Sequence, residues 1–168
     1  MEIWVNVAFA LTEFSIDETK EKLILTITDN GEGMTRELLK TVTDPFCTTR
    51  TTRKVGLGLP LLKLEAEMTG GNIEITSCHI QDDPINHGTS VCAVFYKNHI
   101  DCVPLGNIIE TVTTLIQGHP DTDFLFTHKT GEKEVSLDTR ELRAVLEGVP
   151  LNTYEVVVWI KEYLKEQY

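Results

Sequence analysis

DNGEGM, residues 29–34, decides the fold together with a second glycine-containing segment, VGLGLP, residues 55–60. The first segment follows KLILTIT, whose alternating apolar residues predict a half-buried β-strand that ends in a turn. Gly31 and Gly33 allow the backbone to turn sharply and to come close to a ligand. The carboxylate of Asp29, at the end of the strand, can accept a hydrogen bond from an amino group. An ordinary Asn-Gly turn would explain this segment equally well if it stood alone.

VGLGLP stands immediately before a predicted amphipathic helix over residues 57–69. Glycine N–H groups and the positive end of the helix dipole would point at one place there, an arrangement that favours phosphate. Arg50, Arg53 and Lys54 lie just upstream, in a predicted loop over residues 43–56, and can close over an anion. By itself the segment is neither a P-loop nor a GxGxxG motif. A glycine-rich helix entry beside a solvated basic loop is the alternative interpretation.

Taken in chain order, DNGEGM, DPFCTTRTTR, VGLGLP and HGT resemble the ATP-binding domain of the GHKL group, shared by gyrase, heat-shock chaperone ATPases, sensor histidine kinases and MutL. The pair PF-x-TTR and GLGL is similar to the histidine-kinase branch, and the resemblance covers roughly residues 11–97. It implies an α+β fold of the Bergerat type, a two-layer α/β sandwich in which helices cover one face of a mixed sheet. It also implies ATP and Mg²⁺ as ligands, with Asp29 on the adenine amine and Thr89 at the floor of the adenine pocket. The binding residues that the matching positions imply are Asp29, Gly31, Gly33, Met34, Phe46, Thr48, Thr49, Arg50, Lys54, Gly56, Leu57, Gly58, Leu59 and Thr89.

A narrower resemblance extends beyond this domain. The stretch TDPFCTTRTTRKVGLGLPLLKLEAEMTGG and the later segments PLG, LIQGHPD and LDTRELR are similar to stand-alone ATP-binding proteins of anaerobic bacteria. Those proteins are found alongside subunits of iron-only hydrogenases. The later part of the match lies in residues 101–123 and 137–143. It implies a hydrogenase-related protein partner, which we expect to bind through the C-terminal part of the chain.

The pattern of the chain predicts two modules with a boundary near Asn98. Residues 1–97 are the expected ATP-binding domain, with an apparently truncated first helix, and residues 98–168 are an α+β extension. Thr35, Asp138 and Asn152 are the predicted helix caps. The expected strands are 12–16, 22–28, 72–77, 89–96, 124–128 and 134–137, and the expected helices are 35–42, 57–69, 106–117, 139–146 and 153–166.

The metal site departs from the family pattern. Kinases of this group carry an asparagine on their first helix that ligates magnesium, and Asn6 is the only asparagine before the first expected strand. A complete helix and a turn do not fit in residues 1–11, because one helical turn takes about 3.6 residues. We therefore expect either a chain that starts late or a protein that has lost this helix. Asn6 is the candidate magnesium ligand, with a surface asparagine as the alternative.

The histidines lie after the ATP motifs, and none has the position expected of a phosphorylated residue. We expect all of them at the surface, in turns or at the ends of elements, although His87, beside Gly88 and Thr89, can line the pocket. The histidines are His79, His87, His99, His119 and His128.

Composition limits the remaining functions. The chain has a formal net charge of −11, with 26 acidic and 15 basic side chains, and such a surface repels nucleic acids and anionic membranes. It contains neither a signal sequence nor an apolar run long enough to span a bilayer. The four cysteines stand far apart, without a CxxC pair, as in proteins of a reducing compartment. We expect a cytoplasmic protein.

Three functions remain. The leading hypothesis is an ATP-binding protein, similar to the catalytic domain of sensor histidine kinases, that uses Mg-ATP to phosphorylate a protein or to hydrolyse ATP. The alternative is a regulatory module in which ATP acts as a switch on a partner protein without turnover. An anti-sigma-type serine kinase is the second alternative.

Overall fold

The computed structural model describes residues 11–45 and 56–168. These residues form one sheet and its flanking helices. In chain order the elements are β1 (Leu11–Glu18), β2 (Lys22–Asp29), α1 (Arg36–Thr41), α2 (Gly58–Met68), β3 (Asn72–Cys78), β4 (Gly88–Tyr96), α3 (Ile108–Gly118), β5 (Asp123–Thr130), β6 (Lys133–Asp138), α4 (Thr139–Leu146) and α5 (Tyr154–Gln167).

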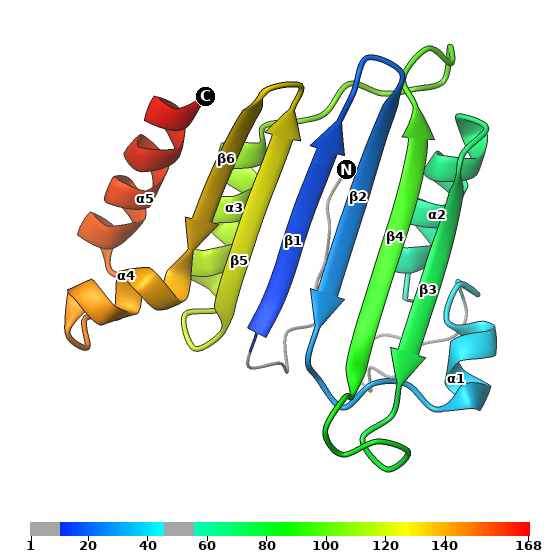
Figure 1. Cartoon of the computed structure of the whole chain (residues 1–168), viewed down its shortest axis with the longest axis horizontal. Helices are drawn as coiled ribbons and strands as arrows, with labels where there is room; N and C mark the ends of the chain where they lie inside the picture. The colour runs from blue at the N-terminus through cyan, green and yellow to red at the C-terminus, as the bar shows by residue number, and fades with distance from the viewer. Residues whose placement is uncertain (1–10, 46–55) are drawn as a thin grey trace.

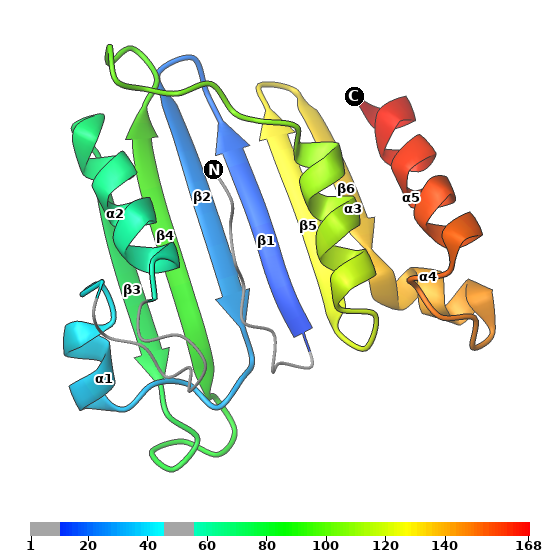
Figure 2. The same ribbon diagram turned by 180° about the vertical axis from the view of Figure 1, so that it is seen from behind.

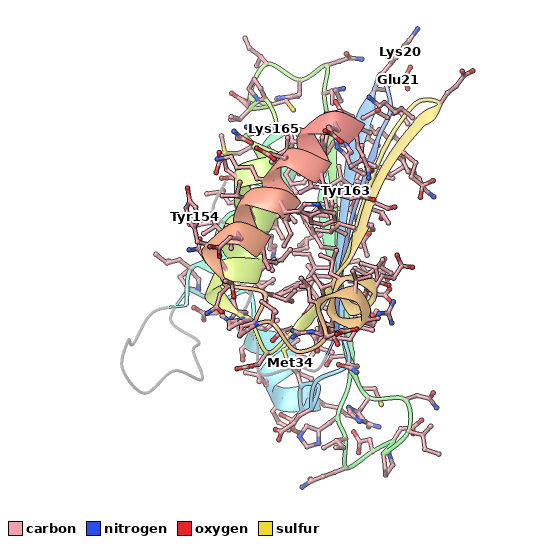
Figure 3. The ribbon with its side chains drawn as sticks, turned by 90° about the vertical axis from the view of Figure 1, so that its left-hand side faces the viewer. Lys20, Glu21, Met34, Tyr154, Tyr163 and Lys165 are labelled. Atoms are coloured by element: carbon pink, nitrogen blue, oxygen red, sulfur yellow. The ribbon has the colours of Figure 1, made fainter. Side chains whose placement is uncertain are left out.

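The described strands form a six-stranded sheet in the order β3-β4-β2-β1-β5-β6. Neighbouring strands are antiparallel except β1 and β5, which run parallel, so the sheet is mixed. Figure 2 shows α2 and α3 lying across one face of the sheet, and Figure 3 shows α5 on the same side as α3. Within the described residues, the face turned to the viewer in Figure 1 carries no helix. This architecture confirms the predicted α+β class and its two layers.

Alternation along the strands places the core between the sheet and the helices. In β1, Phe14 and Ile16 are buried while Glu13 and Asp17 are exposed, as a strand with one covered face requires. Burying one such large side chain stabilises the fold by roughly 1.5–3 kcal/mol. The buried apolar residues are Phe14, Ile16, Leu23, Leu25, Leu62, Ala66, Val91, Ala93, Phe95, Val112, Ile116, Phe124, Phe126, Val135, Leu137, Leu151, Val156, Ile160 and Leu164.

Two of the three predicted helix caps are confirmed. The side chain of Thr35 accepts a hydrogen bond from Leu38 N at 3.3 Å, and that of Asp138 accepts one from Arg140 N at 2.9 Å. The prediction for Asn152 is wrong, because α5 begins one residue later and Thr153 occupies its N-cap position.

Helix α2 buries fewer of its apolar residues than its pattern suggested. Leu62 and Ala66, four residues apart, are buried against β3 and β4. The sequence pattern of this amphipathic helix also predicts Leu61 and Met68 on its apolar face, but each is 48% exposed. At 100° per residue, those two side chains are turned away from the line that joins Leu62 and Ala66.

The C-terminal residues lengthen the same sheet. Strand β5 pairs with β1 along its full length, and the two strands share a stack of Phe14 on Phe126 with ring centroids 5.6 Å apart. The segments around residues 120 and 140, which carry the narrower resemblance, lie together. Arg143 Nε donates to Asp123 Oδ1 at 2.7 Å, and its Nη2 donates to the Pro120 carbonyl. These contacts hold α4 against the start of β5.

His128 was expected at the surface, and that prediction is wrong. It lies in phase with the buried phenylalanines of β5 and is only 4% exposed. Its Nδ1 hydrogen-bonds the Tyr168 hydroxyl at 2.7 Å, and its Nε2 lies 3.3 Å from Glu18 Oε2. Burial raises the pKa of Tyr168 to about 12. The hydrogen bond from Lys97, 2.5 Å from Glu18 Oε1, lowers the pKa of that carboxyl.

Candidate functional site

A row of polar side chains crosses one end of the sheet on the helix-covered face. On each of four adjacent strands, the inward-facing residue at this end of the sheet is polar, and the next inward-facing residue along the strand is apolar. These polar residues are Thr12 on β1, Asp29 on β2, Thr89 on β4 and Ser77 on β3. Thr12 pairs with Asp29, Asp29 with Thr89, and Thr89 with Ser77, so the four stand at one level and on one face. We call them the polar row. Figure 3 shows Met34 at this end of the sheet, opposite the turn with Lys20 and Glu21.

Ser77 is the centre of the hydrogen bonds in this row. Its hydroxyl accepts from Met34 N at 2.7 Å and donates to the Gly88 carbonyl at 3.0 Å. Its Oγ also lies 2.9 Å from Thr89 Oγ1. One side chain on β3 therefore joins the end of the DNGEGM turn to the first residues of β4.

The DNGEGM turn is also fastened to the β3–β4 connection through its backbone. Ile80 N donates to the Glu32 carbonyl at 2.8 Å, and His87 Nδ1 lies 2.5 Å from the Gly31 carbonyl oxygen. Gly33 has φ +69°, and a Cβ there would lie 1.9 Å from the Cys78 carbonyl oxygen. Only glycine fits such a conformation and such a close approach, so the turn holds one fixed shape against β3.

Asp29 presents a partly buried carboxylate at the centre of the row. Burial raises its pKa above the ordinary value, and hydrogen bonds from the backbone of Gly31 and Thr89 act in the opposite direction. One of these bonds joins Gly31 N to Asp29 Oδ1 at 2.9 Å. The bond fixes the orientation of the carboxylate and leaves it lone pairs that can accept hydrogen bonds from a ligand.

The N-terminus of α2 is directed toward the same end of the sheet (Figure 2). A short turn joins α2 to β3, and the helix packs antiparallel to that strand, so its first residue lies toward the strand's last. Leu57 occupies the N-cap position without a side-chain hydrogen bond, and the first turn contains no acidic residue. The N-cap side chain thus makes no hydrogen bond with the N–H groups of the first helical turn, and the helix dipole favours an anion there.

The predicted binding residues that the structure describes fall into two groups. Asp29, Gly31, Gly33, Met34 and Thr89 lie at or beside the polar row. The second group, Gly56, Leu57, Gly58 and Leu59, is at the start of α2, where Leu59 packs against the core and Leu57 is half exposed. The remaining candidates lie outside the described residues: Phe46, Thr48, Thr49, Arg50, Lys54 and the metal candidate Asn6.

Ser77 and Thr12 were missed by sequence reasoning, although the sequence contains a signal for both. Each is a polar residue that falls in phase with buried apolar residues of its own strand, for example Thr12 with Phe14 and Ile16. Thr12 is fully buried, and within the described part of the chain its hydroxyl has no hydrogen-bond partner. His87, weighed as a pocket residue, contacts the glycine turn.

Among residues 11–45 and 56–168, no three His, Cys, Asp or Glu side chains gather closely enough to hold a metal ion. None of the helices in that same part of the chain is both long and apolar enough to cross a bilayer.

Comparison with known proteins identifies a family and finds similar solved structures. The family model described as histidine kinase-, DNA gyrase B- and HSP90-like ATPase matches residues 2–99. Among solved structures, a mycobacterial sensor histidine kinase, MprB, is similar with 22% sequence identity and a TM-score of 0.38. The match covers 51% of this chain and 59% of that one, so this chain spans little more than half of its length. A search of curated proteins finds no match.

Proposed function

The chain belongs to the family of histidine kinase-, DNA gyrase B- and HSP90-like ATPases, and from that premise we propose that it binds ATP at the polar row and the start of α2. The observation that carries the proposal is the position of Asp29. This oriented, partly buried carboxylate lies in line with Thr89 and behind a glycine turn of fixed shape. A group that only accepts hydrogen bonds suits the exocyclic amine of adenine.

The phosphates would lie at the start of α2. The two ends of an ATP molecule need different chemistry, an apolar slot with few polar groups for the base and N–H donors for the phosphates. The uncapped helix start of Gly58, with no acidic side chain in its first turn, supports the second role. Arg50, Arg53 and Lys54, which lie outside the described residues, are the predicted side chains that would close over the anion.

Magnesium would be held mainly by the phosphate groups of ATP and less by side chains that the structure describes. In this proposal Asp29 would contact the base, away from the phosphate end, and the described residues gather no carboxylate cluster for the metal. Asn6 stays the predicted protein ligand. When bound, magnesium would supply positive charge that offsets the negative charge of the phosphates during transfer.

As the activity we propose protein phosphorylation or ATP hydrolysis in the manner of the histidine-kinase branch. This chain's own residues would orient the base at the polar row and hold the phosphates at the helix dipole, which is the positioning part of phosphoryl transfer. An anti-sigma-type serine kinase would use the same pocket and differ only in its acceptor.

The alternative, an ATP-gated module acting on a partner, is favoured by one feature of the C-terminal part. On α5, Trp159 is 48% exposed and stacks on Tyr163 with ring centroids 5.1 Å apart, and Tyr154 is 78% exposed. Exposed aromatic side chains of this kind are enriched at protein interfaces. A hydrogenase-related subunit is the partner that we propose, from the narrower sequence resemblance.

One experiment separates these functions. Phosphate release from Mg-ATP is measured with the protein alone and with candidate partner subunits, beside calorimetric ATP titrations. Sustained turnover supports the enzyme, and tight binding without turnover supports the switch. Absence of ATP binding in calorimetry would refute both.

A further inference from the structure

We propose that Ser77 sets the base specificity of the nucleotide site by fixing the direction of the Thr89 hydroxyl. The inference rests on the proposed placement of adenine at the polar row. It assigns a positioning role to a residue that stands outside the glycine segments and acts through its neighbour.

The direction of the hydrogen bond between Thr89 and Ser77 follows from the single proton of the Ser77 hydroxyl. Ser77 has one hydroxyl proton, and the Gly88 carbonyl, 3.0 Å away, can only accept it. Met34 N–H donates to the same Ser77 oxygen at 2.7 Å, and so takes up a lone pair. With the Ser77 proton on the Gly88 carbonyl, the Thr89 hydroxyl, whose oxygen lies 2.9 Å from Ser77 Oγ, donates its own proton to Ser77.

The proton of the Thr89 hydroxyl is therefore engaged by Ser77, and this hydroxyl can offer a ligand only hydrogen-bond acceptors. Its remaining lone pairs accept hydrogen bonds, as do those of the Asp29 carboxylate next to it in the row. A purine with an amino group at C6 can donate to such acceptors. A 6-oxo purine would place a carbonyl oxygen against them, and polar groups left unpaired in this way are a strong basis for rejecting a ligand.

Removing the Ser77 hydroxyl should release this constraint. In Ser77→Ala the Thr89 hydroxyl loses its acceptor and can turn its proton toward the ligand. The site would then tolerate a 6-oxo base better, mainly through tighter binding of that base. We expect the preference for ATP over ITP, which differ only at this edge of the base, to fall by about tenfold.

The test is calorimetric titration of Mg-ATP and Mg-ITP into the wild-type protein and three variants, Ser77→Ala, Ser77→Thr and Ser90→Ala. Ser77→Thr keeps a hydroxyl and should keep the wild-type preference. Ser90→Ala is the matched control, because Ser90 is the next residue along β4 from Thr89 and hydrogen-bonds Thr28 Oγ1 at 2.9 Å, on the other face of the sheet. It should leave the preference unchanged.

Several outcomes would overturn the proposal. If Ser77→Ala weakens ATP and ITP by the same factor, Ser77 is only structural. If the variant does not fold, Ser77→Cys makes the same test, because a thiol of similar size is a poor acceptor and should also lower the preference.

In a Thr89→Val background the change at Ser77 should no longer alter the ratio, and a persisting effect would contradict action through Thr89. Wild-type protein that binds no ATP would instead refute the proposed function, whereas normal ATP binding with an unaltered ratio refutes the Ser77 role alone.

Discussion

Replacing Asp29 by asparagine tests the centre of the proposed site with the smallest change of shape. The asparagine oxygen can still accept the hydrogen bond from Gly31 N, which is 2.9 Å in the wild type, so the turn should keep its form. Its other terminal atom becomes an N–H donor. That donor would face the amino group of adenine, which is itself a donor, and the base would lose a charge-assisted bond.

The expected magnitude follows from this exchange. A hydrogen bond to a charged group contributes roughly 1.5–3 kcal/mol, and an opposed pair of donors costs about 1–3 kcal/mol more. The sum, about 2.5–6 kcal/mol, corresponds to a loss of affinity of roughly two to four orders of magnitude. In calorimetry at ordinary protein concentrations, ATP binding by Asp29→Asn should therefore be abolished.

The control is Asp17→Asn, which makes the same change of charge at an exposed position near the other end of β1. It should bind ATP as the wild type does. Circular dichroism should show that both variants are folded. An affinity of Asp29→Asn within about twofold of wild type would refute the adenine assignment, since the lost bond alone predicts more than tenfold.

Asp29→Asn should weaken ATP binding, but it should not lower the stability of the ligand-free protein. Because burial raises the pKa of Asp29, the ionised carboxylate destabilises the ligand-free fold at neutral pH. Asp29→Asn should then be at least as stable as wild type there. As the pH falls through the raised pKa toward the ordinary value of 3.8, the folded wild type takes up a proton before the unfolded chain does and regains this stability. The melting temperatures of wild type and Asp29→Asn should therefore approach each other as the pH falls. Thermal melts at several pH values that show a constant difference would contradict burial as the cause of the raised pKa of Asp29.

Three further predictions concern other parts of the molecule. Gly58→Val, at the start of α2, should weaken ATP binding by at least about tenfold through blocked phosphate approach, and normal binding with a normal circular dichroism spectrum would refute that role. Thr12→Val removes a buried hydroxyl that lacks a partner among the described residues, so the ligand-free melting temperature should stay or rise by up to about 4 °C; a clear fall would reveal an interaction of this hydroxyl. Glu18→Gln should lower the free energy of unfolding by about 1 kcal/mol at neutral pH. Because Lys97 lowers the pKa of Glu18, its contribution is present above the ordinary value of 4.5 and disappears as the pH falls through the lowered pKa, so an equal loss at every pH would contradict it.

The fold could be predicted well because its signals are local. Alternation along β1 and β2, the DNGEGM turn and the capping residues Thr35 and Asp138 each depend on neighbours in sequence. The failures came where distant packing decides. Nothing near Asn152 distinguishes it from Thr153 as a cap, and nothing near His128 shows that Tyr168 and Glu18 satisfy its ring nitrogens.

The candidate site divides in the same way. Asp29 and Gly33 were predicted as site residues because the glycine segments, taken together in chain order, resemble those of an ATP-binding family. The sequence signal for Ser77 did not indicate a role, since a serine at the end of a strand is ordinary until its partners are known. Its three partners come from two other segments of the chain. Met34 ends the DNGEGM turn, and Gly88 and Thr89 begin β4.

By itself, the sequence determined the order and type of the elements, the family, and the two segments that would hold the ends of a nucleotide. These depend on short-range periodicity and on the spacing of glycines, of which Gly33, with φ +69°, has a backbone conformation that other residues rarely adopt. The tertiary structure alone decided which four side chains stand in one row, and in which direction their hydrogen bonds run. Lateral alignment of Thr12, Asp29, Thr89 and Ser77 is set by strand register, and a slip of one residue would turn each of them to the opposite face of the sheet.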